Sequence, residues 1–504
     1  MPDFRHILLV LLSAVFLSAP GFAAELKQDE KKGPEAGEPA VFTSTGKVTI
    51  GGQLINYDIT AKETFLLDKK DEAKASIFSF SYIKKGVSDP ATRPVMFVFN
   101  GGPGSASLWL HMGTFGPKRV DVATDKPTDD GAPPYPIVDN IHSILDVADL
   151  VFIDPVGTGF SRVLEDGKGE EHWGVDQDAN SVGRFIRRWL TENKRWASPK
   201  YLAGESYGTT RAAALVAELN DRYNDVAFNG VILVSAILDF ETDRGSYGYI
   251  GSIPTQAAIG WHHNKVDKAK WNNDFDAFLK DARDFAVSDY AKSLLLGQLQ
   301  DHQAHDATVQ RYAEFTGLKP AYIERARLRV GVGRFMKELL RDEGLTLGRY
   351  DGRYTGRDDD DVGERAKSDP SGYAMDAAFT AAMNDYMTRQ LGIEMQQDYT
   401  VLSYEVNRNW KSLEGGGSGG PGYTNVVPGL ARGMRENKDM KVMLASGYYD
   451  QATPFFAAEI SLAEPGVPQD RLVKTYYPAG HMMYLDKGSL EQLAIDVRAF
   501  VKDR

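Results

Sequence analysis

The chain has 504 residues, of which 42% are hydrophobic and 25% are charged, and its formal net charge is −12. This is an ordinary globular composition, long enough for one large domain with an insertion or for two domains. The acidic balance and the lack of a Lys/Arg cluster argue against nucleic acid as a partner. Because the sequence has no cysteine, disulfides, thiol nucleophiles and thiolate metal sites are excluded, and core burial must hold the fold together.

The N-terminus has the pattern of a secretory signal peptide. A short positive region precedes a nearly continuous apolar run over 7–17, and Gly21-Phe22-Ala23 offers small residues for cleavage after Ala23. The run is short for a membrane span, although an uncleaved N-terminal anchor is the alternative. We expect residues 1–23 to be removed, 24–40 to be a disordered tether, and the mature protein to be periplasmic or secreted, without membrane attachment.

Strand patterns open the folded part of the chain. The Gly51-Gly52 pair separates strand-like segments at 47–50 and 54–60, which predicts a hairpin, and 75–83 alternates apolar and polar residues. Later apolar runs have the character of buried parallel strands, since both faces of such strands are covered: 95–99, 150–153, 200–203, 230–235, 441–445 and 473–477. Helix-like stretches between them, 181–190 and 209–219, predict an α/β fold with a mostly parallel sheet.

The segment 241–395 interrupts this alternation because it is helix-prone and poor in buried-strand runs. We expect it to be an inserted cap subdomain on a catalytic core formed by 41–240 and 396–504. Its acidic run Asp358-Asp359-Asp360-Asp361 lacks EF-hand spacing, which favours a solvated loop over a calcium site. Two histidine pairs in it, at 262–263 and 302–305, lack a matching acid pattern. No metal and no other cofactor is therefore expected.

The segment Gly204-Glu205-Ser206-Tyr207-Gly208 is a G-x-S-x-G sequence between a strand-like and a helix-like run. A strand that turns sharply into a helix lifts the serine hydroxyl clear of the backbone and aims the helix N-terminus at the atom it attacks. The motif alone is weak, but this context is the one that the chemistry needs. Ser206 is therefore the candidate nucleophile, and a serine in a tight turn without chemistry is the alternative.

A nucleophilic serine needs a base and an orienting acid, which follow it in strand-turn-helix hydrolases in the order Asp or Glu, then His. Asp450 lies just past 441–445, and His481 lies just past 473–477. Both come after the C-terminal end of a strand, where parallel sheets present catalytic groups. His111 is a rival for the base, but it precedes the serine, which is the wrong order.

The glycine-rich segment 100–107, with the sequence NGGPGSAS, directly follows the strand-like run 95–99. Its glycines permit a turn whose N–H groups point at a ligand. An acyl-transfer intermediate needs two such donors for its oxyanion, one from this loop and one from the residue after the nucleophile. We assign Gly102 and Tyr207 to these places. A phosphate-binding loop is the alternative, but P-loop spacing is missing. The segment 154–161 is expected to be a supporting wall without a catalytic role, and a simple tight turn is the alternative.

These blocks together resemble the serine carboxypeptidase family (peptidase family S10) in order and general spacing, from about Val41 to the C-terminus. They are NGGPGSAS, DPVGTGFS, GESYG, the Asp of GYYD and the His of AGHM. The resemblance implies an α/β-hydrolase fold with an inserted helical cap, and removal of the C-terminal residue from a peptide with a free C-terminus. It implies that Ser206, Asp450 and His481 are catalytic, with Gly102 and Tyr207 as the oxyanion hole. It further implies that Asn100, Gly101 and Glu205 hold the substrate carboxylate and that Met482 lines the leaving-residue pocket.

The chain departs from the family at two places. The family raises the pKa of the residue matching Glu205 with a second glutamate, and the matching position in this sequence is Thr114. Since Glu205 donates to a carboxylate only when protonated, we expect a milder preference for acid pH and tolerance of blocked C-termini. Ser105 occupies the place of a half-cystine, so a disulfide-dependent cap geometry does not transfer.

Two rival functions stay open on the sequence alone. An esterase or an acyltransferase to a non-peptide acceptor would use the same three catalytic side chains, because fold does not fix the substrate. A binding module on an inactive hydrolase fold is the non-enzymatic rival. Such modules usually lack one of the three catalytic side chains, whereas this sequence has a candidate for each. The sequence leaves the oligomeric state open.

Overall fold

The computed structural model describes residues 37–122, 132–220, 226–242, 245–373, 375–412 and 424–503. The expected signal peptide, 1–23, and most of the expected tether, 24–40, lie outside these ranges. Within the described ranges, no helix is both long and apolar enough to cross a bilayer.

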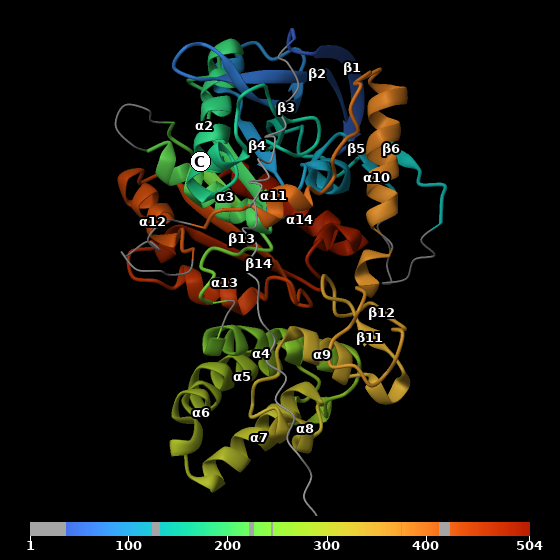
Figure 1. Ribbon diagram of the computed structural model, residues 1–504, viewed down its shortest axis with the longest axis vertical. Coiled ribbons are helices and arrows are strands. Elements are labelled where there is room, and N and C mark those ends of the chain that lie inside the picture. Colours follow the sequence, from blue (N-terminus) through green and yellow to red (C-terminus); the bar gives the residue numbers. More distant parts are fainter. Residues whose placement is uncertain are drawn as a thin grey trace, which may run out of the picture. The chain divides into compact units, whose positions relative to one another are not determined.

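A single large sheet runs through the protein in the order β1-β2-β3-β7-β4-β9-β10-β13-β14, with β8 paired to β3 (Figure 1). β1, β2, β3 and β7 pair antiparallel, whereas β7, β4, β9, β10, β13 and β14 pair parallel. The strands are β1 Val41–Ile50, β2 Gln53–Leu67, β3 Ala73–Lys84, β4 Val95–Phe99, β7 Asp149–Asp154, β8 Arg162–Val163, β9 Lys200–Glu205, β10 Gly230–Val234, β13 Lys441–Gly447 and β14 Leu472–Tyr477.

Each strand predicted above is present, but β1 begins six residues before its expected start at 47 and β2 ends seven residues after its expected end at 60. The hairpin is confirmed, because Ile50 pairs with Gln53 across the Gly51-Gly52 turn. The mostly parallel sheet is confirmed as well. Since all six strands of the parallel part point the same way, their carboxyl ends lie along one edge of the sheet. The segments singled out for chemistry follow β4, β9, β13 and β14 at this edge.

Helices cover both faces of the parallel strands. Alternate residues of each strand enter opposite cores, since side chains of a strand alternate between its faces: Phe97 and Leu202 enter one core, and Met96 and Ala203 the other. The first core is completed by helices α2 Val175–Glu192, α3 Tyr207–Glu218, α12 Val427–Glu436 and α13 Phe455–Leu462, and the second by α1 Leu108–Leu110, α10 Asp376–Asp385 and α14 Lys487–Lys502.

The segment between β10 and α12 is largely helical, with the smaller strand pair β11 Thr346–Leu347 and β12 Thr355–Gly356. Figure 1 shows α4 to α9 grouped together, and they share a third apolar core that Phe455 of α13 joins. α10 instead packs into the sheet's core through Phe379. The limits 241–395 for a cap stay a prediction. The helices are α4 Gly245–His262, α5 Phe275–Phe285, α6 Ala291–Leu296, α7 His302–Thr316, α8 Pro320–Arg325, α9 Val332–Glu338 and, beyond the segment's strands, α11 Tyr404–Arg408.

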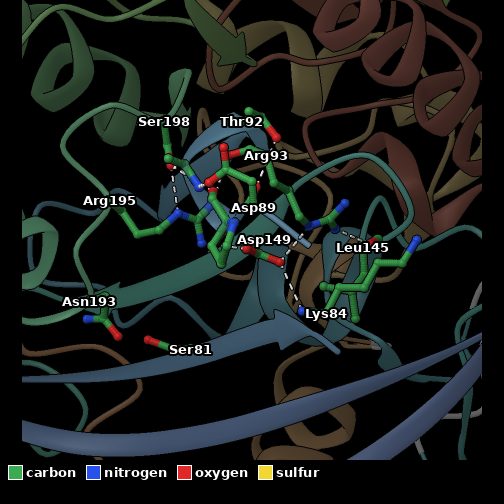
Figure 2. Close-up of polar contacts among 12 residues, drawn as sticks. Ser81, Lys84, Asp89, Thr92, Arg93, Leu145, Asp149, Asn193, Arg195 and Ser198 are labelled. Carbon is green, nitrogen blue, oxygen red and sulfur yellow. Dashed lines mark hydrogen bonds and ion pairs between the residues drawn. The ribbon is translucent and has the colours of Figure 1, made fainter. Parts of the chain in front are cut away.

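A buried ionic network ties the amino ends of the strands together (Figure 2). Asp149 opens β7, and its Oδ1 accepts hydrogen bonds from the backbone N–H of Lys84 at 2.9 Å and from Arg93 Nε at 2.8 Å. Its Oδ2 accepts from Arg195 Nη1 at 2.6 Å. The Asp149 and Arg195 side chains are only 1% and 2% exposed. A carboxylate that satisfies two guanidinium groups away from water is costly to remove, because both cations lose their partner.

We expect Asp149→Ala to lower the free energy of unfolding by about 3–5 kcal/mol, because it leaves two largely buried guanidinium groups without a carboxylate. Denaturant titration measures this loss. The matched control is Asp58→Ala, which breaks the exposed ion pair with Lys85 and should cost about 1 kcal/mol or less. A loss at Asp149 no larger than at Asp58 would contradict the prediction.

Candidate active site

Ser206 occupies a strained turn between β9 and α3. Its backbone has φ 59° and ψ −129°, a region that non-glycine residues rarely adopt and that marks functional turns. The flanking glycines are required by close packing, since a Cβ on Gly204 would lie 2.1 Å from the carbonyl oxygen of Gly208. A Cβ on Gly208 would lie 2.9 Å from the carbonyl oxygen of Phe99. The predicted strand-turn-helix setting of the serine is therefore present.

Asp450 and His481 meet beyond the ends of β13 and β14. His481 Nδ1 lies 2.8 Å from Asp450 Oδ2, and both side chains are buried. The backbone N–H groups of Ala452 and Thr453 donate to Asp450 Oδ1 at 2.8 and 3.0 Å. The Thr453 hydroxyl donates to Oδ2 at 2.7 Å and also lies 3.1 Å from His481 Nδ1. The sequence analysis did not single out Thr453, although it lies three positions after the predicted acid.

The backbone N–H and the backbone carbonyl of His481 are both hydrogen-bonded to other parts of the chain. Its backbone N–H donates to the carbonyl oxygen of Tyr350 at 2.6 Å, and the Tyr350 ring lies 5.2 Å from the imidazole. Its carbonyl oxygen accepts from the Ser235 hydroxyl at 2.6 Å. Burial acts to lower the pKa of His481, but the charge and hydrogen bond of Asp450, with the charge of Glu205, outweigh it and raise that pKa above its ordinary value. Nδ1 thus faces the acid, which leaves Nε2 as the nitrogen for proton transfer.

One cavity of about 420 Å³ joins the predicted residues. Eight of the nine line it, and Asp450 lies behind His481: the lining residues are Asn100, Gly101, Gly102, Glu205, Ser206, Tyr207, His481 and Met482. Arg349 and Tyr350 from the inserted segment, with Met375 and Asp376, also line it. Sequence analysis missed these four, since nothing in the pattern of a helical segment shows which of its residues reach the core.

The loop after β4 presents unused backbone donors to this cavity. Gly102 has φ 101°, which a side chain would disfavour. Among the described residues, no acceptor takes the N–H of Gly101 or of Gly102. The Asn100 side chain is buried and fixed at both ends, since its Oδ1 accepts from the N–H of Leu110 at 3.0 Å and its Nδ2 donates to Glu205 Oε1 at 3.1 Å. Fixed donors of this kind suit an anionic ligand.

Glu205 is a buried carboxyl with a free oxygen. Its Oε2 has no hydrogen-bond partner among the described residues. Burial raises the pKa of Glu205 to about 7, with a further rise from the charge of Asp450, while His481, Tyr484 and Asn100 act in the opposite direction. The raised pKa favours the neutral form of Glu205, and a neutral carboxyl can donate a hydrogen bond to a carboxylate.

Tyr484 is a second polar side chain that interacts with Glu205. Its phenol is buried and interacts electrostatically with Glu205, and its ring packs where a Cβ on Gly113 would lie, at 2.4 Å. The neighbouring Thr114 is buried and its hydroxyl has no partner among the described residues. The hydrogen bond from the Tyr484 phenol acts to lower the pKa of Glu205. Tyr484 lies three positions after His481, but a tyrosine at that spacing does not by itself predict a contact with Glu205.

Several sequence candidates lie elsewhere. His111 is fully buried in the core, with its Nε2 2.7 Å from the Tyr82 hydroxyl, and burial lowers its pKa to about 3. It does not line the cavity. The expected wall at 154–161 is wrong as stated, because none of its residues lines the cavity. Asp154 instead lies one layer behind and accepts from the Ser107 N–H and hydroxyl at 2.8 and 2.7 Å.

The histidine pairs have ordinary partners. His263 Nε2 lies 2.8 Å from the carbonyl oxygen of Gly352, and His305 Nε2 lies 2.8 Å from Glu324. Within the part of the chain that the structure describes, no three His, Asp or Glu side chains gather as a metal site would require.

Comparisons with known proteins show the family and the fold. The family model described as serine carboxypeptidase matches residues 62–477. Among solved structures, Kex1Δp, a prohormone-processing carboxypeptidase from Saccharomyces cerevisiae, superposes with a TM-score of 0.51 at 14% identity, over 87% of this chain and 91% of that one. This likeness concerns the fold, which is the predicted α/β-hydrolase fold.

Curated relatives match over shorter stretches. Serine carboxypeptidase-like 16 of Arabidopsis thaliana is 30% identical over 177 residues, which cover 33% of this chain and 38% of that protein. Serine carboxypeptidase ctsa-3.2 of Caenorhabditis elegans is 25% identical over 185 residues, or 34% of this chain and 31% of that protein. The matched stretch thus spans less than half the length of these relatives.

Proposed function

This chain belongs to the serine carboxypeptidase family, and we propose on that basis that it removes C-terminal residues from peptides through an acyl-enzyme intermediate. The observation that carries the proposal is the juxtaposition, in one cavity, of the serine turn, the Asp450–His481 pair and a buried protonatable carboxyl. The first two supply acyl transfer. The third favours a substrate that ends in a carboxylate, which a simple ester lacks.

In this mechanism Ser206 Oγ attacks the carbonyl carbon of the last peptide bond while its proton passes to His481 Nε2. Asp450 holds the imidazole through Nδ1 and stabilises its charged form. The N–H groups of Gly102 and Tyr207 donate to the oxyanion. The C–N bond then breaks, and His481 returns the proton to the leaving amine. Water, deprotonated by the same imidazole, attacks the acyl-serine ester and releases the shortened peptide.

The carboxylate of the leaving residue would be held by three groups. They are the Asn100 side-chain amide, the Gly101 N–H and neutral Glu205, all of which line the cavity. Met482, beside His481, would contact the leaving side chain. We propose this arrangement because these groups carry unused or switchable donors and line the same cavity as Ser206.

The test is turnover of three matched substrates, namely a blocked dipeptide with a free C-terminus, its C-terminal amide and a simple ester of the same acyl group. Preferred release of the terminal amino acid from the free acid supports the proposal. Preferred hydrolysis of the ester, with no amino acid released from the dipeptide, would support an esterase instead. A chain that neither turns over any of them nor reacts with a fluorophosphonate would be the non-catalytic module.

The pH profile tests the role of Glu205. We expect kcat/KM for the free acid to decline as pH rises through about 7, because the ionised carboxylate then repels the substrate carboxylate. At lower pH the protonation of His481, whose pKa is raised, sets the acid limit. Glu205→Gln keeps an amide donor and should abolish the alkaline decline. A steep fall above about pH 5, or an unchanged profile in Glu205→Gln, would contradict this.

We further propose that the protein is exported and that residues 1–23 are removed on export. The support is the apolar run 7–17 with small residues at the cleavage positions. N-terminal sequencing of the protein recovered from the periplasm or medium tests this, and an N-terminus other than Ala24 would contradict the cleavage site.

A further inference from the structure

A buried guanidinium lies directly behind the loop that follows β4. Arg211, one turn into α3, is 1% exposed, and its Nη1 donates a 2.5 Å hydrogen bond to the backbone carbonyl oxygen of Asn100. Its Nε donates a bond of equal length to Oδ2 of Asp178 on α2, which is 3% exposed. Charged hydrogen bonds this short and this well shielded from water are strong.

Aromatic rings fix the cation further. The guanidinium carbon lies 5.4 Å from the centre of the Phe99 ring and 5.6 Å from that of Tyr207. Phe99 ends the strand before the loop, and Tyr207 carries one of the two N–H groups assigned to the oxyanion. The cation is thus in contact with the end of the strand, the loop and the start of α3 at once.

The loop has almost no room to move relative to α3. A Cβ on Gly101 would lie 2.4 Å from the backbone nitrogen of Tyr207, and one on Gly208 would lie 3.0 Å from the carbonyl oxygen of Asn100. The hydrogen bond from Arg211 therefore holds two surfaces in contact where a small displacement would misalign the donors. A displacement of the donors by about 1 Å is enough to weaken binding and catalysis.

We propose that Arg211 is a positioning residue for recognition of the substrate carboxylate, and that it acts through the peptide group joining Asn100 to Gly101. The carbonyl of this group accepts the charged hydrogen bond, and its N–H belongs to Gly101, lines the cavity and has no acceptor among the described residues. A cation bonded to a carbonyl polarises the peptide group and strengthens its N–H as a donor. Asp178 balances the buried charge. The inference rests on the proposed function, because it concerns the same carboxylate.

The simpler explanation is that the pair only joins α2 to α3. Removing Arg211 alone does not separate the two explanations, since it leaves Asp178 buried without a partner and destabilises the fold. A double variant, Arg211→Met with Asp178→Leu, separates them. Replacing both members of a buried ion pair by apolar residues is often neutral for stability or improves it, while the polarising hydrogen bond to Asn100 is gone.

The chain offers a matched control at the opposite edge of the sheet. Arg195 also pairs with a buried carboxylate, Asp149, and its Nη2 donates to a backbone carbonyl oxygen, that of Arg93, at 2.7 Å. Arg195→Met with Asp149→Leu removes a comparable buried ion pair far from the cavity, and it also leaves Arg93 without its carboxylate. Its effect on folding is therefore expected to be at least as large as that of the Arg211/Asp178 variant, while its effect on the carboxylate site should be absent.

The experiment measures kcat and KM for a peptide free acid and for its C-terminal amide, with thermal unfolding of each variant. We expect the Arg211/Asp178 double variant to lose about tenfold or more in kcat/KM for the free acid, mainly through KM, and clearly less for the amide. The Arg195/Asp149 variant should keep the wild-type ratio of free acid to amide. Both variants are compared at a temperature where they are folded.

A wild-type ratio in a folded Arg211/Asp178 variant would overturn the inference, as would an equal loss for both substrates. Should the double variant not fold, Arg211→Lys keeps the charge but lacks the planar fork that reaches both partners. It is then expected to show the same selective loss, and a wild-type ratio in it would likewise overturn the inference. Failure of the wild-type protein to release any terminal residue would instead refute the proposed function.

Discussion

Ser206→Ala should lower kcat for peptide hydrolysis by about 10⁴- to 10⁶-fold, with little change in KM or in thermal stability. The alanine removes the only atom that would form the acyl ester. The strained backbone, φ 59°, is imposed by the flanking glycine contacts and does not depend on the hydroxyl. The residual activity would come from the oxyanion donors and substrate binding.

The control for this variant is Ser288→Ala, an exposed serine of the inserted segment, which should keep full activity. Fluorophosphonate labelling adds a readout independent of substrate choice, since the reagent should modify the wild-type chain and leave Ser206→Ala unlabelled. Peptidase activity retained in Ser206→Ala would overturn the nucleophile assignment. Labelling of the wild-type protein without peptide turnover would support Ser206 as the nucleophile and contradict the assignment of peptides as the substrate.

Asp450→Asn should lower kcat by about 10⁴-fold while the fold and substrate binding persist. Asp450 Oδ2 accepts from His481 Nδ1 at 2.8 Å, which places the imidazole proton on Nδ1 and leaves Nε2 free to take the serine proton. An asparagine of the same shape can present its NH₂ group to Nδ1. The proton then moves to Nε2, and the base is lost.

The surroundings of Asp450 sharpen this prediction. Its Oδ1 accepts from two backbone N–H groups and its Oδ2 from the Thr453 hydroxyl. An asparagine at this position would therefore direct its oxygen to the two N–H groups and its NH₂ group to His481. Thr453→Val is the matched comparison, because it removes one donor to the acid and keeps the tautomer. We expect a loss of about tenfold or less from it, measured as kcat on the free-acid peptide. Equal losses in the two variants would contradict the tautomer argument.

Much of this fold could be predicted because its parallel strands are buried on both faces and appear in the sequence as continuous apolar runs, such as Val95–Phe99. The nucleophile turn could be predicted for a related reason. Close packing of Gly204 against Gly208 admits no side chain, so the glycines that this turn requires are visible in the sequence. Asp450 and His481 follow strands of the same sheet, and parallel geometry brings such positions to one edge.

The residues that sequence analysis missed share a different physical character. Arg211, Thr453 and Tyr484 act through long-range contacts, to Asn100, His481 and Glu205 respectively. No local pattern marks a helix residue that donates to a loop 111 positions away. Tyr350 and Arg349 were missed because the path of the inserted segment back to the core depends on tertiary packing. The limits of that segment depend on the same packing.

The bond from His481 N–H to the carbonyl oxygen of Tyr350 makes the insertion a structural part of the proton-transfer apparatus. A Cβ at Gly480 would lie 2.3 Å from that same oxygen, so the two backbones are fitted to each other. Removing the stretch around Tyr350 would therefore take away the acceptor of the His481 backbone N–H, while Asp450 and Ser235 would still hold the residue. A substitution near Tyr350 that shifts its carbonyl would therefore also shift the backbone of the segment that carries the base.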